Sequence, residues 1–167
     1  MTIRSANLDD IPMMINLERA CPTAAHWSEE QYGQLFQTSA GGFERLILVI
    51  RGRPSLATDS SARDMGEALL GFLVARRVAS EWELENIVVA SEARRKGLGR
   101  HLLEALIAHA TQANSDSVFL EVRESNGVAR AFYDRAGFRE TGRRKSYYSN
   151  PVEDAILYSR KLSSNPR

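Results

Sequence analysis

The chain has 167 residues, the size of one ordinary domain. Hydrophobic residues make up 43% and charged residues 26%, which excludes a disordered or fibrous chain. The formal net charge is +1, so the charge balance gives no reason to expect direct nucleic-acid binding. No apolar run reaches the roughly 18 residues of a membrane helix, and the N-terminal segment has no apolar signal region. We therefore expect a cytoplasmic protein that makes no membrane contact.

The N-terminal third predicts one strand and two helices. Thr2–Ser5 has the composition of a short strand, and Asn7 or Asp9 can cap the helix that follows it. The segment Ser28–Gln31 has the capping-box pattern that begins a second helix, and Trp27 before it is placed as a hydrophobic staple.

The rest of the chain alternates between strand and helix patterns. Gly52–Gly66 is a long segment of low hydrophobicity, which predicts a flexible loop. The predicted strands are Leu46–Arg51, Ala68–Val78, Leu84–Ala90, Ser117–Val122, Phe138–Tyr148 and Ala155–Lys161, and the predicted helices are Leu98–Ala113 and Val128–Ala136, the latter ended by Gly137.

This order predicts the fold class. It favours an α/β (α+β) fold with a mixed, mostly antiparallel central sheet and helices on both faces. We find no internal repeat and no linker, so residues 1–167 are expected to form a single domain that includes the 52–66 loop.

A candidate anion site lies between a predicted strand and a long helix. The segment Arg94–Arg100 reads RRKGLGR, and its glycines let backbone N–H groups approach a ligand at the helix N-terminus. Cations are unfavourable beside a helix N-terminus unless a polyanion neutralises them. The alternative is a solvated basic turn. No nucleotide P-loop is present, and a dinucleotide fingerprint would need glycine where Leu102 stands, although Glu121 lies at its usual acidic position about twenty residues on.

The spacing of this segment, Arg94-x-x-Gly97-x-Gly99, resembles the acetyl-CoA signature of the GNAT acetyltransferases. Other matching segments spread over most of the chain from Arg4 to Lys161. Together they are similar to the RimI-type group, which acetylates the N-terminal alanine of a ribosomal protein. The long 52–66 loop departs from that group. The matching segments are Trp27–Glu29, Asn86–Val89, Leu120–Arg123, Asn126-x-x-Ala129-x-x-x-Tyr133-x-x-x-Gly137-Phe138, Tyr147–Tyr148 and Glu153–Ala155.

The resemblance implies acetyl-CoA as cosubstrate. We expect no metal site, because the chain has a single cysteine, and His101 and His109 lie eight residues apart without a carboxylate partner in register. In the family, the main chain of the fourth strand pairs with the pantetheine, and the glycine-rich turn holds the pyrophosphate. The implied cofactor-binding residues are Ile87, Val88, Val89, Arg94, Arg95, Lys96, Gly97, Leu98, Gly99, Arg100 and Asn126.

Two residues are candidates for proton transfer during direct attack of an amine on the thioester. Glu121 interrupts an apolar strand, and the resemblance favours it as the general base. Glu83 and Glu85 are rival bases, and an ion pair with an arginine is the structural alternative for Glu121. Tyr133 is the candidate acid, since a phenol beside the sulfur can protonate the leaving thiolate. Its alternative is a helix aromatic beside a buried Phe132.

The expected acceptor is a protein N-terminus, such as that of a small-subunit ribosomal protein. The pair Tyr147–Tyr148 and the acids Glu153–Asp154 are expected to border the acceptor groove and to favour a cationic peptide. Two alternatives stay open. One is a GNAT enzyme for a small-molecule amine, and the other is a non-enzymatic, arginine-rich module that binds ribosome or RNA.

Overall fold

A computed structural model describes residues 1–37, 44–53 and 67–163. The predicted 52–66 loop lies, from residue 54 on, outside the described residues. The chain divides into two compact units. Unit 1 contains Met1–Ala75 and Asn86–Ala105, and unit 2 contains Arg76–Glu85 and Leu106–Arg167. The single-domain organisation stays a prediction.

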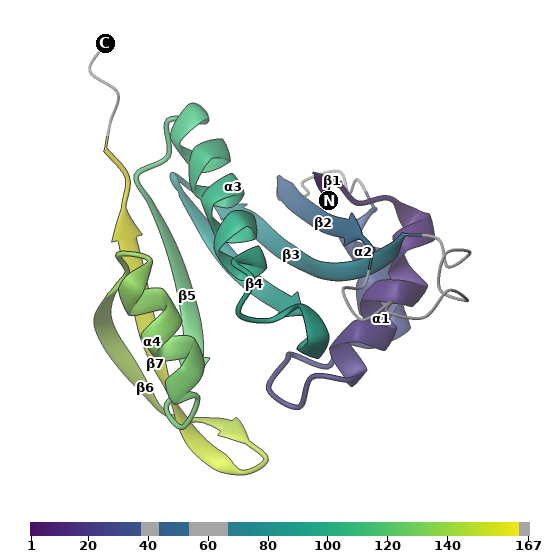
Figure 1. Cartoon of the computed structure of the whole chain (residues 1–167). Coiled ribbons are helices and arrows are strands. Elements are labelled where there is room, and N and C mark those ends of the chain that lie inside the picture. The colour runs from purple at the N-terminus through teal and green to yellow at the C-terminus, as the bar shows by residue number, and fades with distance from the viewer. Residues whose placement is uncertain (38–43, 54–66, 164–167) are drawn as a thin grey trace. The chain divides into compact units, whose positions relative to one another are not determined.

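Seven strands form a mixed sheet in the order β1-β2-β3-β4-β5-β7-β6 (Figure 1). Strand pairs β1–β2, β5–β7 and β6–β7 are antiparallel, and β4 pairs with β5 in parallel. The predicted mixed sheet is therefore confirmed. The strands are β1 (Thr2–Ser5), β2 (Arg45–Gly52), β3 (Ala68–Val78), β4 (Glu81–Val89), β5 (Ser117–Arg123), β6 (Arg139–Ser149) and β7 (Val152–Lys161).

The second helix begins where the sequence places its cap. At the start of α2, the Ser28 side chain accepts from the Gln31 N–H at 3.2 Å and the Gln31 side chain accepts from the Ser28 N–H at 2.8 Å. Trp27 and Tyr32 meet edge to face at 5.6 Å, which confirms the staple. Asn7 caps a short 3₁₀ turn, η1 (Leu8–Asp10), rather than the α-helix after it. The α-helices are α1 (Ile11–Arg19), α2 (Glu29–Leu35), α3 (Leu98–Gln112) and α4 (Gly127–Arg135), and a second 3₁₀ turn is η3 (Ser91–Ala93).

Helices cover both faces of the sheet in unit 1. Phe72 and Val74 of β3 share a buried cluster with Met14 of α1 and Tyr32 of α2. A Cβ built on Gly71 would lie 3.5 Å from Leu102 of α3. Successive residues of a strand point to opposite faces, so α1 and α2 cover one face of β3 and α3 covers the other.

In unit 2, α4 lies against the strands β5, β7 and β6 (Figure 1). Its core is aromatic, with the ring of Tyr133 5.8 Å from that of Phe138 and 6.3 Å from that of Tyr158. The helix ends at Arg135, and Gly137, two residues further on, has a φ of 84°, which confirms the predicted left-handed cap.

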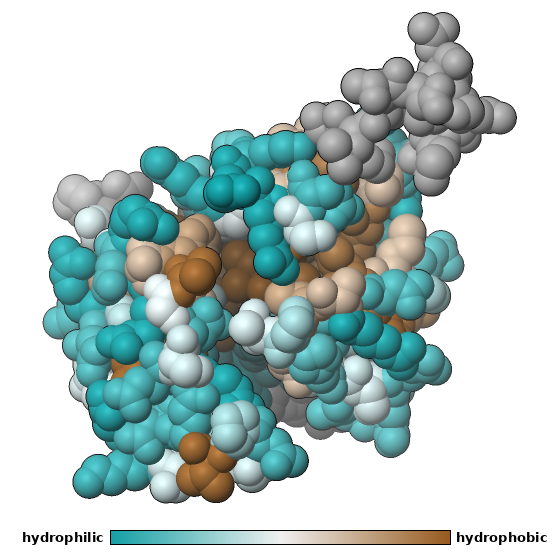
Figure 2. Space-filling view, turned by 60° about the horizontal axis from the view of Figure 1, so that its bottom comes forward, coloured by the Kyte–Doolittle hydropathy of each residue, from teal (hydrophilic) through white to brown (hydrophobic). Residues whose placement is uncertain are grey.

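Strand β4 begins three residues before its predicted start. Ala79 takes a left-handed conformation with φ of 54°, which closes a tight turn between β3 and β4. A non-glycine residue seldom adopts this φ, so the sequence, which predicts a connection over Ala79–Trp82, gives no signal for so short a turn. Hydrophilic residues predominate on the face drawn in Figure 2, in keeping with the mean hydropathy of −0.33. Within the described part of the chain, no helix combines the length and apolar composition needed to span a bilayer.

Candidate active site

The glycine-rich turn of unit 1 forms a cradle of backbone amides at the start of α3. Arg95 and Gly97 have positive φ values of 60° and 81°. The His101 N–H donates to the Gly97 carbonyl at 3.0 Å. The amides of the three preceding residues, Leu98 to Arg100, come too early in the helix to find an intrahelical acceptor. This donor set fits a pyrophosphate, because amides at a helix N-terminus and the helix dipole both favour an anion.

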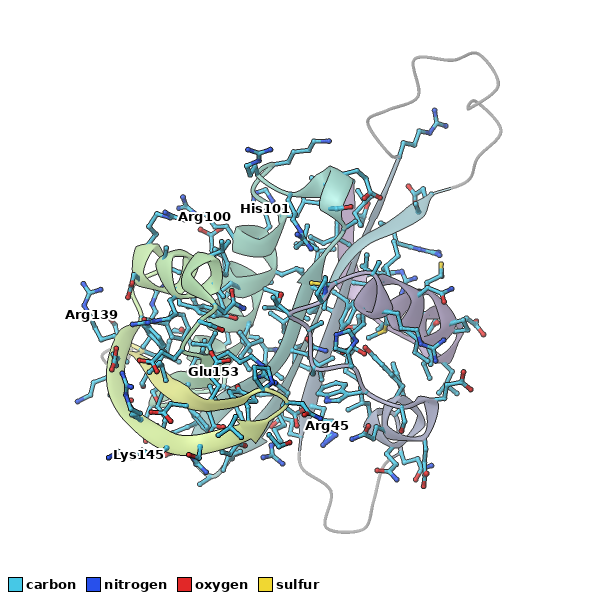
Figure 3. The ribbon with its side chains drawn as sticks, turned by 90° about the horizontal axis from the view of Figure 1, so that it is seen from below. Arg45, Arg100, His101, Arg139, Lys145 and Glu153 are labelled. Carbon is cyan, nitrogen blue, oxygen red and sulfur yellow. The ribbon has the colours of Figure 1, made fainter. Side chains whose placement is uncertain are left out.

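The basic side chains of the turn do not all share this cradle. The Arg94 guanidinium donates to the Val89 carbonyl at 3.1 Å and to the Cys21 sulfur at 3.4 Å. Arg100 forms an ion pair with Glu104 at 2.7 Å, and it lies beside His101 in the first turns of α3 (Figure 3). Arg95 and Lys96 are exposed. The cations most available to an anionic ligand are therefore these two.

A buried carboxylate fixes the segment of β4 that leads to the cradle. Glu18 of α1 is 1% exposed, and its carboxylate accepts from the Asn86 side chain at 2.5 Å and from the Trp27 N–H at 2.9 Å. Our sequence analysis did not single out Glu18. The available signal was its place on the apolar stripe of α1, four residues after Met14 and three after Ile15.

A close approach also restricts this segment. A Cβ built on Gly71 would lie 2.9 Å from the Val88 carbonyl oxygen, closer than real Cβ atoms come. Glycine at this position therefore lets β3 pack tightly against the strand residues Ile87, Val88 and Val89.

Glu121 lies on β5 of unit 2, on the less buried face of the strand. Its side chain is 16% exposed, and its Oε1 is 2.9 Å from the Arg144 Nε on β6. The Tyr147 hydroxyl donates a hydrogen bond to Glu121, which raises the pKa of Tyr147. The structural alternative for Glu121, an ion pair with an arginine, is therefore present. The proton-transfer role stays a prediction.

The rival carboxylates also have an arginine partner. Arg76 of β3 approaches Glu83 through Nε at 2.7 Å and through its terminal nitrogen at 2.6 Å. The same guanidinium lies 3.5 Å from Glu85. Glu83 and Glu85 therefore share the guanidinium of Arg76, whereas Glu121 is paired with Arg144.

Tyr133 is buried in the aromatic core of unit 2. It is 6% exposed, and Phe132 is half-buried, so the alternative in which Phe132 takes the core position is wrong. Burial raises the pKa of Tyr133, and the neighbouring Tyr148 raises it further. The phenol therefore keeps its proton at neutral pH, as a general acid must.

Asn126 ends the loop between β5 and α4. Its side-chain oxygen accepts from the Ala129 N–H at 3.2 Å and caps α4. A contact of its amide group with pantetheine stays a prediction.

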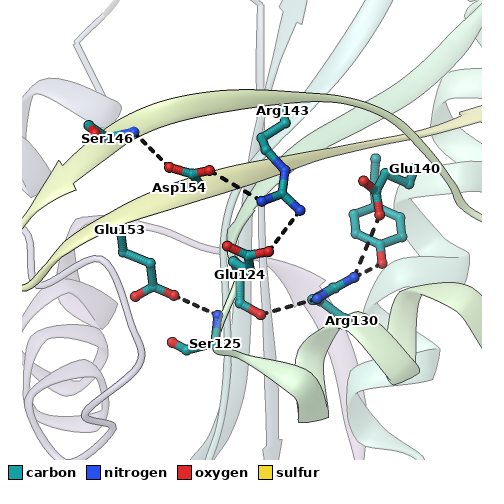
Figure 4. Close-up of polar contacts among 9 residues, drawn as sticks. Glu124, Ser125, Arg130, Glu140, Arg143, Ser146, Glu153 and Asp154 are labelled. Carbon is teal, nitrogen blue, oxygen red and sulfur yellow. Dashed lines mark hydrogen bonds and ion pairs between the residues drawn. The ribbon is translucent and has the colours of Figure 1, made fainter.

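The acidic residues of the last hairpin have partners within unit 2. Glu153 accepts from the Ser125 N–H at 2.5 Å and lies 3.3 Å from Arg123. Asp154 accepts from the Ser146 N–H at 2.8 Å and lies 3.2 Å from Arg143 (Figure 4). These contacts hold the pKa values of both acids below their usual range. Glu153 thus binds β5 and the segment that follows it, whereas Asp154 binds groups of its own hairpin. The preference of these acids for a cationic peptide stays a prediction.

No group of three or more potential metal ligands occurs among the described residues. The Acetyltransferase (GNAT) family matches residues 11–138. A ribosomal protein bS18-alanine N-acetyltransferase of Salmonella typhimurium is 34% identical over 141 residues, 83% of this chain and 90% of the relative. The Escherichia coli K12 enzyme of the same name is 31% identical over 164 residues, 97% of this chain and 98% of the relative.

Solved structures agree with these sequence matches. The crystal structure of the Escherichia coli ribosomal-protein-S18-alanine N-acetyltransferase has a TM-score of 0.73 at 29% identity and covers 99% of this chain and 96% of its own. Ard1 from Thermoplasma volcanium shares the fold, with a TM-score of 0.76 at 23% identity over 97% of both chains. The chain belongs to the GNAT acetyltransferase family. It is an N-acetyltransferase, and its resemblance to the RimI-type group is confirmed.

Proposed function

We propose that this enzyme transfers the acetyl group of acetyl-CoA to the N-terminal α-amine of a ribosomal protein, with the alanine of bS18 as the acceptor. The observation that carries the proposal is the end-to-end similarity to the Escherichia coli enzyme named for that reaction, over 97% of this chain and 98% of the relative.

The proton chemistry of an α-amine suits a single carboxylate base. An α-amine has a pKa of about 7.7–8.0 and a lysine side chain about 10.4. Freeing the amine at pH 7 therefore costs about 1 kcal/mol for the α-amine and nearly 5 kcal/mol for lysine. A carboxylate such as Glu121, relaying through water, is adequate for the cheaper deprotonation.

Acetyl-CoA supplies the acetyl group as a thioester. In unit 1, the cradle amides of Arg95 to Arg100 bind the pyrophosphate, and the main chain of Ile87 to Val89 binds the pantetheine. We assign the Val89 N–H to the thioester oxygen. An oriented donor of this kind contributes roughly 3–4 kcal/mol in other acyl transfers.

In unit 2, we assign Glu121 as the base that accepts the amine proton, Tyr133 as the acid that protonates the departing thiolate, and Asn126 as a further pantetheine contact. Glu121 lies 2.9 Å from the Arg144 guanidinium, and Tyr133 is protonated at neutral pH because the ordinary pKa of a phenol is about 10 and burial raises it further. A proton on the phenol is what the acid role requires before the reaction starts.

The proposal is tested with two peptides of the same sequence that contain one lysine. One has a free N-terminal alanine and the other is N-terminally blocked. We expect the free peptide to be acetylated at its α-amine at least about a hundredfold faster, because the difference in deprotonation cost is several kcal/mol. Mass spectrometry of fragments identifies the acetylated amine.

Spermidine serves as the small-amine control, and binding to heparin against acetyl-CoA-agarose tests the RNA-binding alternative. Equal rates on the two peptides, or activity confined to spermidine, would contradict the N-terminal acceptor. Retention on heparin without retention on acetyl-CoA-agarose would contradict the enzymatic assignment of the chain itself.

A further inference from the structure

A cation lies directly against the proposed base. The Arg144 Nε is 2.9 Å from the Glu121 Oε1, with side-chain exposures of 56% and 16%. Because β7 separates β5 from β6 in the sheet, the guanidinium reaches across β7 to make this contact. The Arg144 carbon Cζ also lies 5.5 Å from the centre of the Tyr147 ring.

The other charged groups near this pair have partners of their own. In unit 2, Arg76 pairs with Glu83 and Glu85, and Arg123 pairs with Glu153 while stacking 4.1 Å above the Tyr148 ring. Arg143 pairs with Glu124 at 2.7 Å and with Asp154 at 3.2 Å (Figure 4). On β6, Arg144, Tyr147 and Tyr148 interact with Glu121, and Glu83 of β4 acts on the same Tyr147. The residue opposite Glu121 on β7 is the apolar Leu157.

The backbone of β6 holds Arg144 in this place. The pairing of β6 with β7 shifts register between Arg144 and Tyr148, and Ser146 inside the shift has a φ of 50°. Asp154 accepts from the Ser146 N–H at 2.8 Å, which anchors the irregular segment. The bulge brings both Arg144 and Tyr147 to Glu121, although a regular strand would point residues of odd separation to opposite faces.

We infer that Arg144 is the counter-ion that neutralises Glu121 and thereby lets the acceptor amine bind in its uncharged, nucleophilic form. The inference rests on the proposed function, because it takes Glu121 to face the acceptor amine. A carboxylate without a counter-ion would attract the ammonium form of the acceptor and stabilise its positive charge. The acceptor would then bind more tightly, but its nitrogen would stay protonated and would have no lone pair with which to attack the thioester. The ion pair of Glu121 and Arg144 carries no net charge, and its carboxylate still has an oxygen that can accept a proton.

Arg144→Gln tests this inference because it leaves Glu121 uncompensated. Without Arg144, the Glu121 carboxylate favours the ammonium form of the bound acceptor, and a nearby opposite charge raises the pKa of an amine by roughly 1–3 units. Because the site is partly exposed to solvent, we expect the low end of this range for the bound amine, about one unit. We expect the pH below which kcat falls to rise by about one unit, so that kcat at pH 7 falls about tenfold. The acceptor KM at pH 7 falls several-fold in the same variant, because the ammonium form is now attracted. Damage to the fold alone would raise KM.

Three companion variants sharpen the experiment. Arg143→Gln removes the same charge from the neighbouring residue, whose partners are Glu124 and Asp154, and it should leave both KM and the pH dependence unchanged. Arg144→Lys keeps a cation and should stay close to the wild type. Arg144→Met removes the charge while keeping an apolar stem, and it replaces Arg144→Gln if that variant does not fold.

The assay follows thiol release with a lysine-free peptide that has a free N-terminal alanine, from about pH 6 to pH 10, and circular dichroism checks folding. A raised or unchanged KM in the neutral Arg144 variants, an unmoved pH dependence, or equal effects in Arg143→Gln would overturn the inference. So would a full shift in Arg144→Lys.

Glu121→Gln separates this inference from the proposed function. Wild-type kcat in that variant would contradict the role of Glu121 as base, whatever Arg144 does. The double variant Glu121→Gln/Arg144→Gln should show no fall in KM relative to Glu121→Gln, because residue 121 then has no negative charge that could attract the ammonium form of the acceptor. A fall of the same size in that background would overturn the inference while leaving the acceptor assignment standing.

Discussion

Removal of one buried hydroxyl tests the proposed acid. Tyr133→Phe keeps the ring in its aromatic cluster, where its neighbours are Phe132 at 5.2 Å, Phe138 at 5.8 Å and Tyr158 at 6.3 Å between ring centroids. No cavity forms, so the free energy of unfolding should change by less than about 1.5 kcal/mol.

The effect on catalysis should be much larger than the effect on stability. General acid catalysis contributes about 10²- to 10⁴-fold, so kcat should fall by that factor, or roughly 2.7–5.5 kcal/mol of activation free energy. Acetyl-CoA binding should survive, because the phenol is not needed to hold the pyrophosphate. Thiol release at saturating acetyl-CoA and peptide measures kcat, and urea unfolding measures stability.

Tyr158→Phe is the matched control. Tyr158 is 2% exposed in the same cluster, and its hydroxyl accepts from the Arg130 Nε at 3.4 Å. Its loss should cost a similar amount of stability and leave kcat within about threefold of the wild type. Equal losses of kcat in the two variants, or an unchanged kcat in Tyr133→Phe, would refute the reasoning and return Tyr133 to a packing role.

Two further predictions concern the cradle and acid stability. Acetyl-CoA should raise the melting temperature by mass action. Gly99→Asp puts a carboxylate at the helix N-terminus, and it should abolish that rise while leaving the ligand-free protein folded. A larger rise of the melting temperature with NAD would favour a dinucleotide site. Asp10 is 1% exposed and its pKa is lowered, mainly by the hydrogen bond from Arg4, so its contribution to stability is present above the ordinary aspartate pKa and is lost as pH falls through the lower folded-state value. Arg4→Gln should therefore flatten the loss of stability below about pH 4 in urea titrations, and an unchanged slope would contradict the assignment.

Local signals in the sequence were enough for many elements. The capping box of Ser28–Gln31, the left-handed glycine at Gly137 and the alternation of β5 each depend on a few neighbouring residues, and each is confirmed. The glycine-rich turn was found for the same reason, since the φ values and free amides at a helix start are local properties. The start of β4 was misplaced, because Ala79 supplies a left-handed turn without the glycine that normally marks one.

The tertiary structure decided which partners the charged side chains take. The sequence identified Glu121 as a carboxylate on a sheet face, but it left open which of 19 arginines would reach it, and Arg144 does so across an intervening strand because of a bulge in β6. The same holds for Glu153, which pairs with Arg123 and accepts from the Ser125 N–H. It holds also for Asp154, which pairs with Arg143 and accepts from the Ser146 N–H. The backbone pattern of an element depends on residues a few positions apart, whereas ion pairs depend on distances between residues far apart in the chain. Only the folded arrangement of strands fixes those distances.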